Sequence, residues 1–246
     1  MGIDNMYKES LKKTINMIKE YTKDIDGVSL MFSGGRDSVV LYHILKTYFE
    51  NLKVDLITVT TGMEFDNWYE FMQIHYPETI YIDTNVFESW KQYNRLPDIQ
   101  NKICCYEQRK IIKSYKLKYN RVVLQGKKSK DKFRTHLHIE PVKRYKNGGV
   151  RIQPLIDWSQ EEINAYIKEF DLKYCDTIMW CTLCFYLNRP YEVKMERLNN
   201  NPKLAERFYS TVHSIYTNNP ELQKEYETEE KYINWFLNCK QRIVNK

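Results

Sequence analysis

Hydrophobic residues along the chain fall into short continuous runs and into longer stretches with helical spacing. Four runs are short, apolar and rich in β-branched residues, and they predict buried strands: residues 28–32, 54–60, 79–82 and 121–124. Apolar residues three and four positions apart predict helices over residues 3–24, 39–48, 67–75 and 105–119. Strands that alternate with helices are joined by right-handed crossovers, so this pattern predicts an α/β fold with a doubly wound parallel sheet.

The C-terminal part of the chain has the spacing of helices alone. After Pro202, apolar and aromatic residues recur at helical spacing and predict two or three helices, interrupted at residues 199–202 and 218–220. Aromatic residues with this spacing favour a packed core over a platform for nucleobases. We therefore expect an α/β domain over residues 1–175 and a helical C-terminal extension with cysteines over residues 176–246.

Between the first predicted strand and its helix, residues 32–38 have the composition of an anion-binding turn, Phe-Ser-Gly-Gly-Arg-Asp-Ser. Adjacent glycines let the backbone approach an anion, and the free N–H groups and the dipole of the first helical turn stabilise its charge. The serine hydroxyls can donate further hydrogen bonds, and Asp37 can hold Mg²⁺ between phosphates. The alternative is a tight turn in which Asp37 only caps the helix. The flanking strand and helix favour the phosphate cradle.

Residues 33–38 resemble the Ser-Gly-Gly-x-Asp-Ser loop of the PP-loop ATP pyrophosphatases. This loop differs from a Walker loop because no Gly-Lys-Ser/Thr follows it. In that superfamily the loop grips the β and γ phosphates of ATP while the α phosphate is attacked, so that AMP is transferred to a substrate and pyrophosphate leaves. The resemblance implies ATP and Mg²⁺ as cofactors, with Asp37 and Ser38 as catalytic residues. It also implies these nucleotide contacts: Phe32, Ser33, Gly34, Gly35, Arg36, Asp37 and Ser38.

Residues 60–65, Thr-Thr-Gly-Met-Glu-Phe, follow the second predicted strand. From spacing alone they would be an ordinary strand-to-helix loop. They resemble the Asp/Thr-Thr-Gly-x-Glu-Phe segment of the reductase and sulfurtransferase branch of the superfamily, which includes PAPS reductase. There the segment lies by the adenine and ribose, so the resemblance adds Thr60 and Gly62 to the nucleotide contacts. Because loops after parallel strands share one edge of the sheet, we expect this loop and the first one to face one crevice.

A loop dense in cations, residues 125–134, follows the fourth predicted strand. A lysine run is usually a solvated face, but this one stands at the strand end where parallel sheets bind ligands. It resembles the family's Gly-x-Arg-x-x-Glu-Ser-x-x-Arg segment, which contacts phosphate or sulfate, with lysines where the family often has arginine. The resemblance implies Arg134 as a catalytic residue. It further implies these nucleotide contacts: Gln125, Gly126, Lys127 and Lys128.

Three further segments complete the expected domain. Residues 86–103 show no regular pattern and predict irregular structure, and residues 143–149 predict a basic turn. Residues 150–159 resemble the family's strand that ends in Pro-Leu/Ile-x-Asp-Trp. Ser159 with Glu162 forms a capping box, which predicts a helix over residues 160–170.

The six cysteines of this chain are too few for a disulfide scaffold, and their grouping points to a metal. The Cys181-x-x-Cys184 spacing suits zinc, iron–sulfur or a redox dithiol. The adjacent pair Cys104-Cys105 is awkward for one tetrahedral zinc ion, whereas a cubane cluster offers a different iron atom to each thiolate. The arrangement resembles the [4Fe-4S] signature of assimilatory APS reductases, which implies that these four cysteines hold a cluster. Zinc and unligated buried cysteines are the alternatives.

The amino-acid composition indicates the charge of the ligand and the cellular compartment of the protein. The formal net charge of +6 and the pI near 8.8 suit an anionic ligand such as a nucleotide, a nucleic acid or a sulfate ester. No apolar run approaches the length that spans a membrane, and the lysine-dotted N-terminus lacks the apolar core of a signal peptide. We therefore expect a soluble cytoplasmic protein that has no membrane partner.

Two features separate the activities of the resembled family. Its APS and PAPS reductases carry a catalytic cysteine in a C-terminal Glu-Cys-Gly-Leu-His motif that this chain lacks, since Cys239 stands in Phe-Leu-Asn-Cys-Lys. The intact loop at residues 33–38 favours cleavage of ATP between the α and β phosphates. The sequence thus predicts a PAPS reductase-like sulfurtransferase that adenylates an acidic substrate, such as nucleic acid, and then replaces the activated oxygen with sulfur.

The expected enzyme is similar to the ATP pyrophosphatase component of DNA phosphorothioation systems. The partners that the resemblance implies are an adenine nucleotide, the acidic substrate, a sulfur-donor protein and a second copy of the chain. A cysteine desulfurase or a thioredoxin-like protein would be a suitable donor. Two alternatives stay open: an APS or PAPS reductase that releases sulfite, with Cys239 or a partner's thiol as nucleophile, and a nucleotide-binding module without catalysis.

Overall fold

The computed structural model describes residues 6–98, 103–104, 107, 110–111, 122–129, 140–146, 148–176, 183 and 190–238. These residues belong to two compact units. The first unit falls within residues 1–58, 66–82 and 112–179, and the second within residues 59–65, 83–111 and 180–246. The division near residue 175 that the sequence suggests stays a prediction. No helix in the described ranges is both long and apolar enough to cross a membrane.

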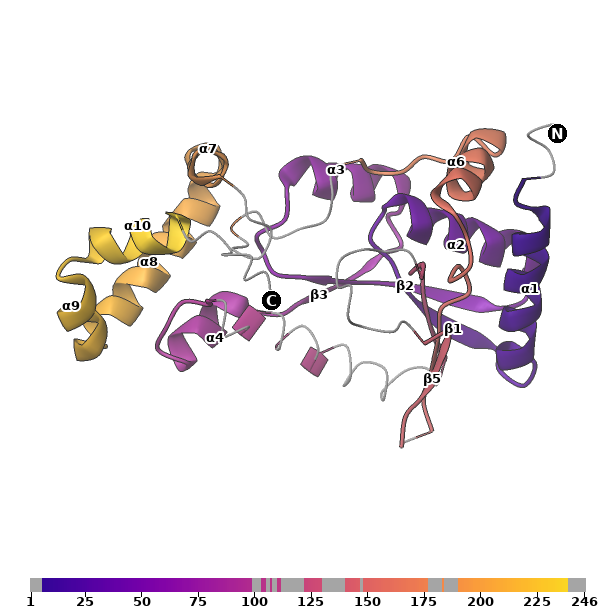
Figure 1. The fold of residues 1–246 in the computed structure, drawn as a ribbon, viewed down its shortest axis with the longest axis horizontal. Coiled ribbons are helices and arrows are strands. Elements are labelled where there is room, and N and C mark those ends of the chain that lie inside the picture. The colour runs from indigo at the N-terminus through magenta and orange to yellow at the C-terminus, as the bar shows by residue number, and fades with distance from the viewer. Residues whose placement is uncertain are drawn as a thin grey trace, which may run out of the picture. The chain divides into compact units, whose positions relative to one another are not determined.

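A sheet of six strands forms the centre of the first unit (Figure 1). The strands and helices of this α/β part are, in chain order, α1 (Lys8–Thr22), β1 (Gly27–Met31), α2 (Arg36–Tyr48), β2 (Lys53–Thr60), α3 (Asp66–His75), β3 (Ile80–Asp83), β4 (Val122–Gln125), β5 (Val142–Arg144), β6 (Val150–Ile152) and α6 (Gln160–Glu169). The spatial order is β3-β2-β1-β4-β6-β5. Strand β1 is parallel to β2 and β4, β4 is parallel to β6, and the β5–β6 pair is antiparallel. The predicted α/β fold with a doubly wound parallel sheet is confirmed, except that its edge strand β5 runs antiparallel.

The central strand β1 explains why continuous apolar runs predicted the sheet correctly. Val28 and Leu30 are fully buried, and the intervening Ser29 is buried as well. A strand that has parallel neighbours on both sides is covered on both faces, so its sequence is apolar throughout. Strands β2 and β3 lie on one side of β1, and β4 and β6 lie on the other side. The direction in which successive strands are added to the sheet therefore reverses between β1 and β4. In open α/β sheets, ligands bind at such a reversal, beyond the carboxyl ends of the strands.

Two elements of the secondary structure were not predicted. Residues 86–103 were expected to be irregular but begin with a helix, α4 (Val86–Gln92), because Phe87 and Trp90 bury one side of two helical turns. The predicted basic turn at residues 143–149 is present between β5 and β6 and closes through Gly148 at a φ of +82°, but its first two residues belong to strand β5. In both places a tertiary contact stabilises an element that is too short for its periodicity to be recognised.

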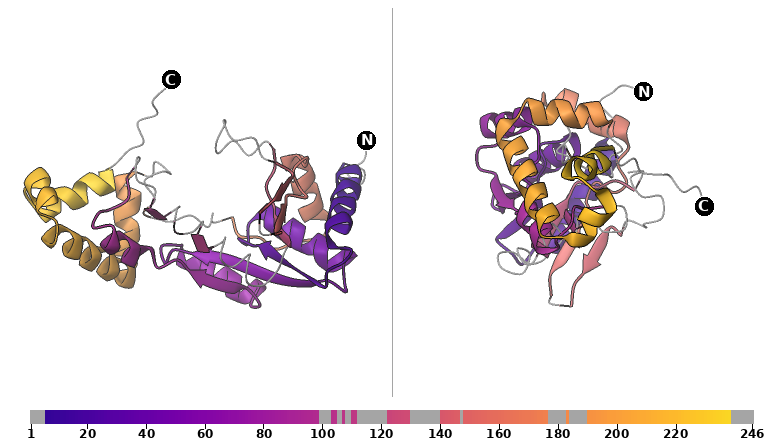
Figure 2. Two further views of the ribbon diagram at one scale, coloured as in Figure 1. Left: turned by 90° about the horizontal axis from the view of Figure 1, so that it is seen from below. Right: turned by 90° about the vertical axis from the view of Figure 1, so that its left-hand side faces the viewer.

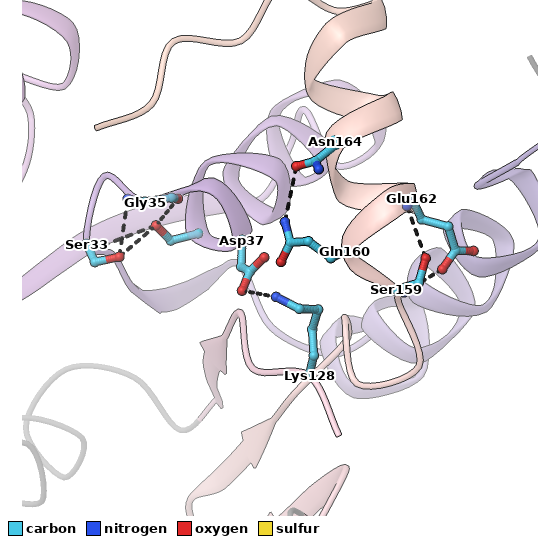
Figure 3. A network of polar contacts seen from close by, with 9 residues as sticks. Ser33, Gly35, Asp37, Lys128, Ser159, Gln160, Glu162 and Asn164 are labelled. Atoms are coloured by element: carbon cyan, nitrogen blue, oxygen red, sulfur yellow. Dashed lines mark hydrogen bonds and ion pairs between the residues drawn. The ribbon is translucent and has the colours of Figure 1, made fainter. Parts of the chain in front are cut away.

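The helix at residues 160–170 was predicted correctly. It is α6, and its capping box is present: the Ser159 hydroxyl accepts from the Glu162 N–H at 3.1 Å, and the Glu162 carboxylate accepts from the Ser159 N–H at 2.6 Å (Figure 3). These two bonds satisfy two of the four N–H groups that every helix start leaves without a partner. The local sequence alone therefore determines where this helix begins.

The second unit contains helices α4, α7 (Tyr191–Asn199), α8 (Pro202–Thr217), α9 (Pro220–Tyr226) and α10 (Glu229–Asn238), of which α7–α10 are drawn orange to yellow in Figure 2. Three of these helices follow residue 201, as predicted, and α8 and α9 each begin with a capping asparagine followed by proline. Their apolar faces form one core with α4, which includes Trp90, Phe208 and Phe236. The fully buried Lys194 donates from Nζ to the Leu237 carbonyl at 2.8 Å, and so caps the end of α10 from α7.

Candidate functional site

The loop that follows β1 is anchored to the sheet before it turns. The Phe32 N–H donates to the Ile57 carbonyl at 2.8 Å, and the Phe32 carbonyl accepts from the Thr58 hydroxyl at 2.5 Å. Gly34 then adopts a φ of +71°, and a Cβ atom there would stand 2.5 Å from the sulfur of Met72 on α3. Only glycine can adopt the positive φ and also leave room for the close packing. The first glycine of the motif is therefore required by the structure of the loop.

Two serine hydroxyls tie the loop to the first turn of α2 (Figure 3). The hydroxyl of Ser38 donates to the Gly35 carbonyl at 2.8 Å and lies 3.1 Å from the hydroxyl of Ser33. The Gly35 N–H in turn donates to the Ser33 hydroxyl at 3.3 Å. Helix α2 starts here without a side-chain cap, so its N-terminal dipole is available to an anion. The loop has the local geometry of a phosphate cradle.

The loop after β4 meets this cradle at the point where the strand order reverses. Lys128 is almost fully buried, and its Nζ forms an ion pair with Oδ2 of Asp37 (Figure 3). At Gly126 a Cβ atom would stand 2.9 Å from the carbonyl carbon and oxygen of Asp37 and 3.1 Å from the Ser38 nitrogen. The structure thus brings Lys128, Gly126 and the first turn of α2 together. Lys127 is exposed and Gln125 is half-buried at the end of β4.

A segment that sequence reasoning missed braces the cradle from the other side. The Cys175 N–H donates to the Gly34 carbonyl at 2.8 Å. Arg36 pairs with Asp176 at 2.9 Å and lies over the ring of Tyr174, 5.0 Å from its centroid. The hydrogen bond that Arg36 donates to Asp176 raises the pKa of the Arg36 guanidinium, which keeps its charge. No motif marks residues 174–176, and only the folded chain shows that they contact the loop.

The second unit contains the segment 60–65, and the structure shows how it is held. Glu64 is buried, and its Oε1 accepts from both the N–H and the hydroxyl of Thr61 at 2.8 Å. Arg197 of α7 donates to the Glu64 carbonyl at 2.9 Å. Gly62 has a φ of +74°, and its missing Cβ would stand 2.8 Å from Nη1 of Arg207 on α8. Arg197 therefore holds this segment from α7, and Arg207 lies directly against Gly62, while Thr60 at the start of the segment is buried.

The cysteine motifs are only partly within the described residues. Cys104 is half-buried, and its sulfur accepts a hydrogen bond from the Trp90 indole N–H at 3.1 Å. Its neighbour Ile103 and the buried Leu183, which stands between Cys181 and Cys184 in the sequence, both belong to the core of the second unit. The flanks of both motifs thus enter the same apolar core.

Five predicted residues lie outside the described part of the chain: Cys105, Arg134, Cys181, Cys184 and Cys239. Within the described ranges no group of three or more histidine, cysteine, aspartate or glutamate side chains could hold a metal ion. The cysteine site therefore stays a prediction.

Two loops that meet beyond β1 and β4 of a mainly parallel sheet, one of them a glycine turn into a helix, define an α/β nucleotide-binding fold of the adenine nucleotide alpha hydrolase type. The chain also matches the phosphoadenosine phosphosulfate reductase domain over residues 27–178, more than half of its length. The protein belongs to this family, as the resemblance of its PP-loop implied. No curated protein sequence matches the chain.

The chain is also similar to solved structures of low sequence identity. The U34-tRNA thiolase NcsA from Methanococcus maripaludis, with its [4Fe-4S] cluster, is 16% identical and matches 99% of this chain and 84% of its own, with a TM-score of 0.54. The phosphoadenylyl-sulfate reductase from Candida auris is 17% identical over 70% of this chain and 87% of its own, with a TM-score of 0.49. The NH3-dependent NAD synthetase from Campylobacter jejuni is 15% identical over 94% and 96%, with a TM-score of 0.49.

Proposed function

We propose that this protein binds ATP at the loop of residues 33–38, cleaves it to AMP and pyrophosphate, and so activates an acidic substrate for sulfur transfer. The observation that carries the proposal is the contact between the Ser-Gly-Gly loop and Lys128 at the reversal of the strand order. A ligand bound there faces the N-terminus of α2 and a buried ammonium group, which together stabilise negative charge on the departing pyrophosphate. The family match to a PAPS reductase domain supports the same class of ligand.

Each group of the cradle has a role in this proposal. The N–H groups of the first turn of α2 bind phosphate oxygens, and Gly126 lets the Lys128 loop lie directly against that turn. Lys128 is held in place by Asp37 and contributes its positive charge to the phosphates. The predicted roles of Thr60 and Gly62 at the nucleoside, and of Arg134 at an oxyanion, belong to the same proposal.

The donor atoms fit the two metal cofactors that the proposal includes. The Asp37 carboxylate and the hydroxyls of Ser33 and Ser38 are oxygen donors of the kind that Mg²⁺ prefers. Bound Mg²⁺ would neutralise charge that develops on the phosphates. The thiol of Cys104 already accepts an N–H bond from Trp90, and such bonds tune the potential of sulfur-ligated clusters. We propose that Cys104, Cys105, Cys181 and Cys184 hold a [4Fe-4S] cluster.

The substrate and the partners belong to the proposal as well. The net charge of +6 supports an acidic substrate, and nucleic acid is the first class to test. The tRNA thiolase with a [4Fe-4S] cluster among the proteins of this fold makes tRNA a natural probe beside DNA. A sulfur-donor protein such as a cysteine desulfurase and a second copy of the chain are further proposed partners.

The test is pyrophosphate release from ATP by anaerobically purified protein, with iron and sulfide analysis of the same sample. We expect release that depends on ATP and rises with the correct acceptor. We also expect a loss of about 100-fold in Asp37→Asn, which removes the proposed Mg²⁺ ligand and the partner of Lys128, and in Lys128→Met, which removes a positive charge from the phosphates. Lys146→Met, an exposed lysine near the β5–β6 turn, is the matched control and keeps the wild-type rate. ATP binding without pyrophosphate in any acceptor mixture would instead favour the non-catalytic module.

A second candidate is an APS or PAPS reductase, which the family match favours. In this activity the sulfonate of APS or PAPS is transferred to a cysteine thiol and the adenine nucleotide leaves. A second thiol, from a thioredoxin-like partner, then attacks the thiosulfonate, so that sulfite is released and a disulfide forms. Sulfite from APS or PAPS without pyrophosphate from ATP would establish it, and Cys239→Ser would then abolish the reaction. The proposed sulfurtransferase keeps its activity in Cys239→Ser, so this one variant separates the two candidates.

A further inference from the structure

A pocket in the second unit is lined by none of the residues that the proposed ATP chemistry uses. It has a volume of about 1110 Å³ and opens between the segment after α4 and helices α9 and α10. Three aromatic rings and three carboxylates characterise its lining: Tyr226, Tyr232, Trp235, Asp98, Glu221 and Glu225. All of them belong to the second unit, so the pocket depends on this unit alone.

The aromatic residues form a rigid floor. Tyr232 and Trp235 stack at an interplanar angle of 9° with their centroids 5.8 Å apart, and Tyr226 lies 5.0 Å from Tyr232 and 5.5 Å from Trp235. Tyr232 is fixed further because its hydroxyl accepts from the Leu96 N–H at 2.9 Å. Tyr226 and Trp235 are only half-buried, so their rings contribute π-electron density to the pocket.

The wall opposite α9 is equally well held. The amide of Asn219 donates to the Asn94 carbonyl at 2.9 Å, and the amide of Asn94 donates back to the Asn218 carbonyl at 3.3 Å. These reciprocal bonds clamp the segment after α4 to the start of α9. The pocket is therefore formed before any ligand binds, which lowers the entropy cost of binding.

The charges at the pocket are predominantly negative. Arg95 is neutralised by Asp98 in an ion pair of 2.5 Å. Glu221 and Glu225 stand one helical turn apart on α9, and neither has a salt-bridge partner among the described residues. Burial raises the pKa of Tyr226, and the neighbouring carboxylates of Glu225 and Asp98 raise it further, so both carboxylates act on the aromatic floor.

We propose that this pocket binds an organic cation, an alkylammonium or guanidinium group on an apolar stem. The faces of Tyr226 and Trp235 attract a cation through their quadrupoles, and Glu221 and Glu225 supply the opposite charge. The buried Leu96 and the half-buried Leu222 give the stem an apolar wall. A phosphate-bearing ligand would be repelled by the same carboxylates, which excludes nucleic acid from this pocket although the chain as a whole is basic. Lysine and arginine side chains of a protein and free polyamines share this chemistry.

The test is a titration of the full-length protein, followed by tryptophan fluorescence and by calorimetry. The probes are spermidine, an arginine-containing tripeptide, and the same tripeptide with neutral citrulline in place of arginine. We expect one or both cations to bind and to change the fluorescence, the change to vanish in Trp235→Phe, and citrulline to bind at least tenfold more weakly. Binding of spermidine alone identifies a free polyamine as the ligand, and binding of the arginine peptide identifies a protein side chain.

The decisive variants keep the fold and remove only charge. Glu221→Gln and Glu225→Gln each raise the Kd for the cation roughly tenfold, because each removes a carboxylate that faces the bound cation. Glu206→Gln, an exposed glutamate on α8 outside the pocket, leaves the Kd unchanged. Equal binding of citrulline and arginine, unchanged affinity in the double Glu→Gln variant, or quenching of Trp235 by a single-stranded oligonucleotide would overturn the proposal. Pyrophosphate release from ATP is unaffected by these variants, so this test and that of the proposed function fail independently.

Discussion

Replacing Gly126 with alanine tests whether the two loops at the candidate site need their direct contact. The new Cβ would stand 2.9 Å from the carbonyl carbon and oxygen of Asp37 and 3.1 Å from the nitrogen of Ser38. All three are backbone atoms at the start of α2, so no side chain can rotate to make room. The two loops must move apart instead.

The size of the effect follows from this geometry. An ordinary contact of about 3.4 Å requires the loops to separate by roughly 0.5 Å, and overpacking of this kind costs about 1–3 kcal/mol in the free energy of unfolding. In a protein of this size each kcal/mol lowers the Tm by about 2–4 °C. A phosphate site that is displaced by a fraction of an ångström loses about tenfold in kcat/KM, because its groups no longer meet the reacting atoms.

The assay combines thermal unfolding, followed by circular dichroism, with pyrophosphate release from ATP. Gly148→Ala is the matched control: Gly148 has a φ of +82° in the β5–β6 turn, and a Cβ atom there meets nothing within 4 Å. The left-handed backbone makes this control cost about 1–2 kcal/mol. We therefore expect both variants to be destabilised and only Gly126→Ala to lose activity.

Three results would contradict the reasoning. A Gly126→Ala protein with the wild-type Tm and rate would show that the loops are not in contact. A lowered Tm with full activity would show that the contact is structural only, and the role of the Gly126 loop at the phosphates would be wrong. An equal loss of activity in Gly148→Ala would show that the assay reports stability alone.

Three further predictions concern the first unit. Lys128→Met leaves the carboxylate of Asp37 without its cation and lowers the free energy of unfolding by about 1–3 kcal/mol. The double variant with Asp37→Asn recovers part of this loss, as urea unfolding of both single variants and the double variant should show. A coupling energy near zero in this double-mutant cycle would contradict the ion pair. Thr14→Val removes the buried acceptor of the Trp158 indole N–H, now at 2.8 Å, and costs about 1–3 kcal/mol in urea unfolding, where an unchanged midpoint would speak against the bond. Burial raises the pKa of Tyr76 to about 12. Unfolded tyrosine releases its proton near pH 10, so stability is complete below that pH and falls as the pH rises towards 12; urea titrations at several pH values should show a shallower fall in Tyr76→Phe, and identical slopes would refute the assignment.

The local sequence determined the elements whose signals lie within a few residues. Continuous apolar runs predicted β1 and β2, because strands with parallel neighbours are covered on both faces. The capping box at Ser159 predicted the start of α6, and the asparagine–proline segments predicted the helix breaks after which α8 and α9 begin. The Ser-Gly-Gly turn predicted the phosphate cradle, because its glycines and hydroxyls act on the backbone next to them.

Short elements were not determined in this way. Helix α4 occupies two turns and β5 three residues, so neither shows a full period of the hydrophobic pattern. Both exist because of a partner in another segment: the core of the second unit buries one side of α4, and β6 pairs with β5. Sequence patterns describe one segment at a time, whereas these elements are stabilised between segments.

The candidate site was therefore predicted only in part from the sequence. Residues 33–38 suggested the cradle, but its pairing with Lys128 joins positions 91 residues apart, and its brace by residues 174–176 has no motif. The pocket lined by Trp235 is likewise formed by side chains from three separate segments of the chain. Local propensities fix backbone turns and caps, while the strand order and helix packing decide which distant side chains meet. The local sequence determined the conformation of this glycine turn, and the tertiary structure decided which charges surround it.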